Sequence, residues 1–319
     1  MTTSWPRRYR FAIQGGPFGD PAPLRDHARR AEDLGYVEFY SSDHIGAPGG
    51  ERQGGAHVVD PFIPLIVASE ATSRLGVGPL VLNNEFYNPA LLARTAATVD
   101  RLTDGRLVLG LGTGYAEAEH AAIGSPIRPP GTRVSRLGES LAVLRSLLDT
   151  GTVDHAGTHV SVHFDDVGIE PSQGHVPFLI GGHGRRVVEL AGQYADVYQF
   201  TGLTHGEGGA PSAGGFGLGD LTERAQWLDE AAGDRNDSIE RSALVQLTSV
   251  GDDATSYSEL ADQFEMDAET IEQTPFVLAG SVAQVVDKIE RLRERLGITH
   301  YVVRDPEGFA PIVDALGDR

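Results

Sequence analysis

The sequence contains no cysteine and a single lysine, Lys288. The absence of cysteine excludes disulfides, thiolate metal sites, iron–sulfur clusters and cysteine nucleophiles together. With one lysine, an anion site must use arginine, histidine or backbone amides, and Schiff-base chemistry has one poor candidate on a charged helix. The reducing cytoplasm is the simplest compartment for such a chain, and we expect a cytoplasmic protein.

Long apolar runs are also missing. No stretch approaches the ~20 apolar residues of a membrane span, and no apolar run follows the N-terminal MTTSWPRRYR. Positive charge is scarce, because 26 arginine and lysine residues stand against 45 acidic residues, which gives a formal charge of −19. Such a charge repels phosphate backbones and anionic lipids. We expect a soluble protein that binds a small molecule and neither nucleic acid nor membrane.

Short β-branched or aromatic runs recur along the chain, separated by segments with helical spacing. These runs are residues 9–14, 36–42, 77–82, 106–111, 178–180, 196–200, 242–250 and 300–304. Eight alternations of apolar strand and helix in 319 residues fit a closed parallel barrel. We therefore predict an α/β fold, with residues 1–319 forming a single (β/α)8 TIM barrel; an open, doubly wound sheet is the alternative.

Helix signals agree with this fold. In residues 24–35 a single face carries Leu24, Ala28, Ala31 and Leu34. The segment 88–106 begins with an Asn cap and Pro89, and ends at Asp104-Gly105. Its residues in helical register are Leu91, Leu92, Thr95, Val99 and Leu102.

Two segments depart from the alternation. GTVDHAGTHVSVHFDD, residues 151–166, predicts a small β-hairpin insertion at about 151–170. Residues 201–220 are rich in glycine, and an unstructured stretch of this length is typical of an active-site lid or a disordered loop. His155, His159 and His163 are four residues apart, but in a β segment that spacing is too wide for one small ion. We expect a solvated hairpin there and no metal site.

Polar and small residues follow the predicted strands, where the catalytic face of a barrel lies. Asp43 and His44 follow the second strand, and His44 can act as an acid or base near neutral pH, with Asp43 fixing its tautomer or contacting a ligand. The alternative is a loop histidine whose neighbouring acid caps the next turn. No P-loop, G-x-S-x-G or H-E-x-x-H motif is present.

Two glycine-rich turns also follow strands. In IGGHGRRVVELAG, residues 180–192, a helix that begins near Arg185 predicts an anion cradle, while a tight turn that requires glycine is the alternative. GLGTGYAEAE, residues 110–119, resembles a dinucleotide fingerprint but has Tyr115 at the position of its last glycine. Its glycines are better explained by the close approach of a flat ring.

Taken in order, the motifs closely resemble the bacterial luciferase-like family, and within it the coenzyme F420-dependent oxidoreductases of actinobacteria. The resemblance rests on EDLGYVEFYSSDH, TSRLGVGPLVLNNEFYNPALLARTAATVDRLTDGRLVLGLGTGY, PPGTRVSRLGESLAVLRSL, THVSVHFDD and FLIGGHGRRVVELAGQYADV. It covers nearly the whole chain and is densest over residues 62–200.

The resemblance implies a barrel that holds a deazaflavin, or alternatively FMN, at its C-terminal mouth. Asp43 and His44 match the family's acid–imidazole pair, whose histidine faces the redox ring. Asn83 lies on a segment that flanks the ring and often carries a non-prolyl cis peptide, here within Pro79 to Leu82. Gly112 and Thr113 match the turn that contacts the ring. The phosphate turn is matched by Gly182, His183, Gly184 and Arg185.

Two departures bear on the substrate. The family's sugar-phosphate dehydrogenases carry a glutamate where this chain has Tyr115, and an aromatic residue where it has Pro48. Both differences argue against sugar-phosphate oxidation and leave His44, with Tyr115, as the proton carrier.

The resemblance therefore predicts an F420-dependent oxidoreductase in which hydride passes between the deazaflavin C5 and a small organic substrate. The catalytic residues would be His44, Asp43 and Tyr115. An FMN-dependent monooxygenase and a non-catalytic flavin- or deazaflavin-binding protein are the alternatives. We also expect a homodimer, because luciferase-like barrels pair through outer helices; the apolar faces of 61–74 and 89–102 are candidates.

Overall fold

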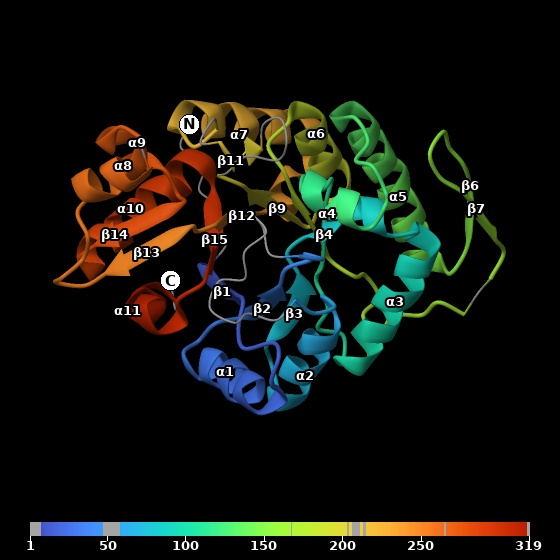
Figure 1. Cartoon of the computed structure of the whole chain (residues 1–319), viewed down its shortest axis with the longest axis horizontal. Coiled ribbons are helices and arrows are strands. Elements are labelled where there is room, and N and C mark those ends of the chain that lie inside the picture. The colour runs from blue at the N-terminus through green and yellow to red at the C-terminus, as the bar shows by residue number, and fades with distance from the viewer. Residues whose placement is uncertain are drawn as a thin grey trace.

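A computed structural model describes residues 8–46, 58–166, 168–202, 204–205, 211–212, 215–264 and 266–317. Its main feature is a nine-stranded sheet in the order β3-β2-β1-β15-β12-β9-β8-β5-β4, wrapped by helices (Figure 1). These strands are β1 (Arg10–Gln14), β2 (Glu38–Ser41), β3 (Gly76–Pro79), β4 (Leu82–Asn83), β5 (Leu109–Gly112), β8 (Phe178–Gly181), β9 (Val197–Phe200), β12 (Glu240–Leu244) and β15 (Ile298–Val303). Every pairing between them is parallel.

The sheet curls into a nearly closed barrel. β3 and β4 are consecutive in sequence, and a parallel bridge joins Val77 of β3 to Leu107, just ahead of β5. β3 and β4 share one barrel position, so the nine strands fill eight positions. The predicted (β/α)8 fold is confirmed.

One predicted strand is wrong in its extent. The run at 242–250 is divided: β12 ends in the barrel at Leu244, and Leu247–Val250 forms β13. β13 pairs in parallel with β14 (Val277–Gly280), in a separate two-stranded sheet. Together with α8 (Tyr257–Phe264) and α9 (Ala268–Gln273), this sheet lies at one side of the barrel (Figure 1).

Helices cover the outside of the barrel. They are α1 (Pro21–Asp33), α2 (Ile63–Ala71), α3 (Pro89–Leu102), α5 (Pro130–Thr150), α6 (Arg185–Tyr194), α7 (Leu218–Ala232), α10 (Val282–Leu296) and α11 (Pro306–Leu316). A short helix, α4 (Glu117–Ala122), contacts the ends of the strands. α1 buries the predicted Leu24, Ala28 and Ala31. Burial of such apolar side chains contributes about 25 cal/mol per Å² of apolar area.

α3 begins as predicted, because the Asn88 side chain accepts hydrogen bonds from the first backbone amides of the helix. Its predicted apolar face is partly wrong. Leu92 and Val99 are buried, but Leu91 and Leu102 are 55% and 57% exposed. The buried face is completed instead by small residues, Ala93, Ala96 and Ala97.

Two short pairs of strands stand apart from the barrel. β6 (Val153–Ala156) and β7 (Ser161–Phe164) form an antiparallel hairpin between α5 and β8, which projects beside α3 and α5 (Figure 1). β10 (Thr204–His205) pairs with β11 (Pro211–Ser212) inside the predicted lid segment, 201–220. Residues 203, 206–210 and 213–214 of that segment lie outside the described residues.

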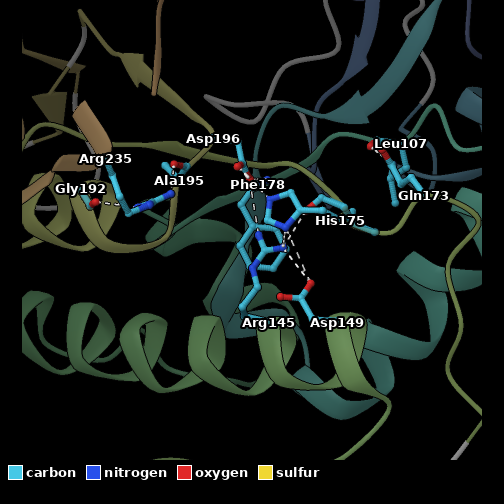
Figure 2. A network of polar contacts seen from close by, with 11 residues as sticks. Leu107, Arg145, Asp149, Gln173, His175, Phe178, Gly192, Ala195, Asp196 and Arg235 are labelled. Carbon is cyan, nitrogen blue, oxygen red and sulfur yellow. Dashed lines mark hydrogen bonds and ion pairs between the residues drawn. The ribbon is translucent and has the colours of Figure 1, made fainter. Parts of the chain in front are cut away.

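A polar network lies at the starts of β8 and β9 (Figure 2). The Asp196 carboxylate, just before β9, accepts hydrogen bonds from the Phe178 backbone N–H at 2.8 Å and from His175 Nε2 at 2.9 Å. His175 Nδ1 in turn accepts from Arg145 of α5 at 3.0 Å. The network fastens α5 to the start of two strands, at the end of a barrel that serves stability.

The described helices include none that is long and apolar enough to cross a membrane. The same residues contain no group of three or more histidine, cysteine or acidic side chains placed to hold a metal ion. In the hairpin, His163 Nδ1 lies 3.2 Å from the Asp154 carboxylate.

Candidate active site

The strand order fixes where the predicted residues lie. Because the barrel strands are all parallel, the ends of β2, β4, β5 and β8 open on one face. The segments at 43–44, 83–84, 112–115 and 182–185 directly follow or end these strands. They therefore share the C-terminal rim.

His44 is held between two side chains of the same rim. Its Nδ1 lies 2.9 Å from Glu119 Oε1, and its Nε2 lies 3.5 Å from the Tyr115 hydroxyl oxygen, the outer limit of a hydrogen bond. The rings of His44 and Tyr115 meet edge to face, with centroids 6.0 Å apart. Burial and the Glu119 carboxylate raise the pKa of Tyr115, which keeps its hydroxyl protonated near neutral pH.

Asp43 contacts residues other than His44. Its carboxylate accepts a hydrogen bond from the Asn83 backbone N–H at 2.8 Å and one from the Tyr87 hydroxyl at 3.1 Å. Burial raises the pKa of Asp43, against the lowering effect of those donors. Asp43 thus joins the end of β2 to the end of β4, and the acid beside the imidazole ring is Glu119.

Asn83 is fixed on both ends of its side chain. Its Oδ1 accepts from the Glu85 backbone N–H at 3.1 Å, and its Nδ2 lies 3.0 Å from His120 Nε2. His120 Nδ1 lies 3.1 Å from the Ser125 carbonyl, so the ring proton is on Nδ1 and Nε2 accepts from Asn83. Gly114 completes this contact: it has φ +71°, and a Cβ there would lie 2.1 Å from Asn83 Oδ1.

The structure explains why two positions of β5 are glycine, which the sequence did not. A Cβ on Gly110 would lie 2.0 Å from the Pro79 carbonyl oxygen, and one on Gly112 would lie 2.7 Å from Val81 Cγ2. They let the segment between β3 and β4 approach β5. The cis peptide bond of this segment joins Leu80 to Val81, within the predicted range. Half-buried Thr113 continues the turn.

The turn at 182–185 differs in part from the predicted cradle. Arg185 faces Glu189, 3.0 Å away, and Arg186 donates to the Gly131 carbonyl and Ser135 hydroxyl of α5. Arg186 thus fastens α6 to α5, whereas Arg185 is exposed beside the turn and pairs within its own helix. What remains at the turn is the start of α6, whose N-cap residue, Gly184, makes no side-chain capping hydrogen bond.

Parts of the predicted lid are anchored. Arg224 of α7 donates to the Thr201 carbonyl at 2.9 Å, and Phe216 is fully buried and packs against Phe276. Pro48 lies outside the described residues.

Sequence reasoning missed two residues of α4, Glu119 and His120. Both are buried, at 7% and 1% exposure, although AEAEHAA reads as a polar helix. No periodic signal marked them, because α4 has only six residues and the partners of Glu119 and His120, His44 and Asn83, lie far away in sequence.

The rim has features that fit a flat anionic cofactor. The Thr201 hydroxyl at the end of β9 and the Asn84 side-chain amide nitrogen at the end of β4 are buried without a hydrogen-bond partner in the described part of the chain. Such polar atoms are normally paired. The uncapped N-terminus of α6 presents amide groups to an anion. The residues present therefore fit a cofactor with polar ring edges and a phosphate.

Comparisons with known proteins agree with this geometry. The model of the family described as luciferase-like monooxygenase matches residues 4–211. An F420-dependent glucose-6-phosphate dehydrogenase of Intrasporangium calvum is 35% identical over 56% of this chain and 53% of its own length. One of Microbacterium testaceum is 32% identical over 60% of this chain and 56% of its own length. The chain thus spans about half the length of the curated relatives it matches.

Solved structures show the same fold. The F420-dependent tetrahydromethanopterin reductase of Methanopyrus kandleri covers 97% of this chain and 98% of its own, with a TM-score of 0.70 and 21% identity. An F420-dependent secondary alcohol dehydrogenase, in complex with an F420–acetone adduct, has a TM-score of 0.73 and 19% identity over 97% of this chain and 98% of its own. At these identities the likeness concerns the fold alone.

Proposed function

The chain belongs to the luciferase-like monooxygenase family, and from this we propose that it is an F420-dependent oxidoreductase acting on a small organic substrate. The observation that supports this most is the position of His44. It lies at the barrel mouth with one ring nitrogen on Glu119 and the other facing Tyr115. The F420-dependent relatives point to the cofactor.

The cofactor would be held by residues of four strand ends. Asn83, Gly112 and Thr113 would flank the ring, Thr201 would pair with its polar edge, and the turn from Gly182 through His183 and Gly184 to Arg185 would receive the phosphate at the start of α6. When bound, a deazaflavin supplies or accepts a hydride at C5. The role of the protein is placement and proton transfer.

His44 would carry the proton. In the reducing direction, the substrate double bond gains a hydride on one atom and a proton from His44 Nε2 on the other, which together make a two-electron reduction. His44 regains its proton from water. Asp43 would keep the ends of β2 and β4 together during turnover.

We propose an activated double bond or imine as the reducible group in preference to an alcohol. Tyr115 is protonated at neutral pH, and the sequence resemblance matches it to a glutamate of the family's sugar-phosphate dehydrogenases. A phenol donates a proton to a developing negative charge better than it removes one from an alcohol. The glucose-6-phosphate dehydrogenases are therefore relatives in fold and cofactor, with a different substrate.

Binding of the cofactor is the first test. Purified protein titrated with oxidised and reduced F420 should perturb the deazaflavin absorbance with a Kd in the micromolar range or below. No binding at micromolar protein would refute the proposal. Substrate-dependent incorporation of oxygen with reduced FMN would instead support the alternative, an FMN-dependent monooxygenase, because free reduced FMN consumes oxygen without an enzyme.

The His44→Ala variant tests the chemistry. Turnover should fall by about 10²- to 10⁴-fold, because the proton carrier is lost, while the Kd for F420 stays within about threefold. His159→Ala, on the exposed hairpin, is the matched control and should turn over like the wild type. Unchanged turnover in His44→Ala would remove the residue from the mechanism. Loss of turnover without loss of cofactor binding would exclude a non-catalytic binding protein.

We further propose a homodimer that pairs through α2 and α3. Ile63 of α2 and Leu91 of α3 are 61% and 55% exposed, so both large apolar side chains are accessible to a partner. Analytical ultracentrifugation of a Leu91→Glu variant should show monomers where the wild type shows dimers. We also place the protein in the cytoplasm, on the basis of its cysteine-free composition.

A further inference from the structure

We propose that Glu119 is a positioning residue that holds the ring proton of His44 on Nδ1, so that Nε2 is the nitrogen that exchanges the proton with substrate. This inference rests on the proposed function of the same site. It assigns a role to a residue of α4 that neither the sequence motifs nor the comparisons single out.

The contact between Glu119 and His44 determines which ring nitrogen carries the proton. Its side chain is 8% exposed and meets His44 Nδ1 at 2.9 Å from Oε1. A carboxylate only accepts hydrogen bonds, so the short contact places the proton on Nδ1. In a neutral imidazole the other nitrogen, Nε2, then carries the lone pair.

The other side of the ring agrees with this tautomer. Nε2 faces the Tyr115 hydroxyl, which is a donor while it is protonated. Tyr115 O–H therefore donates to Nε2, and Nδ1–H donates to Glu119 Oε1, so each acceptor has one donor. The reverse tautomer would leave the Glu119 carboxylate facing a lone pair at 2.9 Å. A contact of that kind is strongly unfavourable in a half-buried site.

The neighbouring acid cannot take over this role without other losses. Both oxygens of Asp43 already accept hydrogen bonds, from the Asn83 backbone and from Tyr87. The Arg304 cation lowers the pKa of Tyr115, but burial and the Glu119 carboxylate outweigh it. Glu119 is therefore the one described carboxylate in hydrogen-bond contact with the ring.

α4 itself is fixed well enough to position a ring. The next residue, His120, is almost fully buried and binds Asn83, and its ring lies 4.8 Å from that of Phe86. Two adjacent residues of one short helix thus contact two different strand ends. A movement of α4 would displace both His44 and Asn83.

Proton transfer to the substrate is consistent with this tautomer. When His44 gives a proton from Nε2 to the substrate, the Nδ1 proton stays on the ring, and the Glu119 carboxylate stabilises the positive ring before the transfer. No proton moves to Glu119, as in other imidazole–carboxylate pairs.

Nitrogen NMR of histidine-labelled protein, without cofactor, tests the tautomer directly. The His44 signals are assigned by comparison with His44→Gln. We expect Nδ1 to be protonated and Nε2 unprotonated in the neutral ring of the wild type. A wild-type ring that carries its proton on Nε2 overturns the inference, whatever any variant does.

Two substitutions at one position separate positioning from packing. Glu119→Gln keeps an oxygen acceptor and should retain the Nδ1–H tautomer with partial activity. Glu119→Ala removes the acceptor, should shift the ring toward Nε2–H, and should lower kcat by at least about tenfold with KM within about threefold. Glu117→Ala, exposed on the same helix, should match the wild type in both readouts.

The two proposals fail in different ways. If F420 does not bind, the proposed function fails, and the NMR result still reports on the pair. If F420 binds and turns over while Glu119→Ala keeps the Nδ1–H tautomer or wild-type kcat, the positioning role of Glu119 is wrong and the function stands.

Discussion

At the scale of single residues, the imidazole of His44 meets a carboxylate 75 residues away in sequence, that of Glu119. His44, Asn83 and Tyr115 follow strands, a pattern that is visible in sequence because polar residues there interrupt apolar runs. Which carboxylate meets the imidazole was not visible. Asp43 is adjacent in sequence, yet its carboxylate accepts from Asn83 and Tyr87, and the contact with the ring belongs to Glu119.

Lys288 shows how a single buried charge makes stability depend on pH. It is 2% exposed, and its amine donates to the Val277 and Ile271 carbonyls at 2.6 and 3.2 Å. Burial lowers its pKa to about 7. The unfolded chain keeps that proton up to about pH 10, so between these values the unfolded state binds more protons and stability rises with pH.

We predict that Lys288→Met removes this dependence. Urea unfolding of both proteins from pH 6 to pH 10 should show the free energy of unfolding of the wild type rising relative to the variant above about pH 7, by up to about 1.4 kcal/mol per pH unit. Other titrating groups are common to both proteins and cancel. A difference that stays constant across this range would contradict the assignment.

At the scale of elements, strand existence was predictable and strand partners were not. Eight apolar runs were located, but the run at 242–250 reads as one strand because its alternation continues through Gln246. The change of sheet after Leu244 depends on β14, a four-residue run too short to identify alone. α3 shows the same limit, since alanines at helical spacing take the place of two predicted leucines, Leu91 and Leu102, at its buried face.

Glu32 connects two elements through backbone amides. Its carboxylate, at the end of α1, accepts hydrogen bonds from the amides of Ser73, Arg74 and Leu75 ahead of β3, at 3.0, 2.6 and 3.1 Å. Burial alone would raise its pKa, but the three donors together lower it below the ordinary value. The stability from the ionised form is therefore present above the unfolded pKa and is lost as pH falls through the folded value.

We predict that Glu32→Gln lowers the free energy of unfolding by about 1–2 kcal/mol at pH 7, because hydrogen bonds to a charged acceptor are replaced by weaker ones. The difference should shrink as pH falls below about 4. Chemical denaturation at pH 7 and pH 3.5 measures it, with the exposed neighbour Asp33→Asn as the control. An equal loss at both pH values would show that the charge plays no part.

At the scale of the whole molecule, the barrel and the family were predicted and confirmed, because eight repeats of one strand–helix pattern leave few topologies. The cofactor prediction is supported by the relatives' names. The side-chain contacts of the site could not be predicted from the sequence, because they depend on loops and on long-range contacts. Glu119 and His44, for example, are 75 residues apart.

The formal charge of −19 is also a property of the whole molecule. Self-repulsion of like charges destabilises the compact state, and salt screens it, since the Debye length falls from ~10 Å at 0.1 M to ~3 Å at 1 M. We therefore expect Tm to rise by several degrees as NaCl increases over this range, measured by calorimetry. A Tm that falls would mean that ion pairs such as Arg30–Glu307 outweigh the repulsion.

The first barrel strand, β1, pairs with the last, β15, in register from Arg10 with His300 to Ile13 with Val303. During synthesis on the ribosome, β1 emerges early and must wait for almost the entire remaining chain before its second neighbour exists. Until then the incomplete barrel has two unpaired strand edges, at β1 and at β12, to which strands of other chains can add. The two edges are therefore paired only after the six residues of β15, Ile298–Val303, have been synthesised, and until then the polypeptide is prone to aggregation.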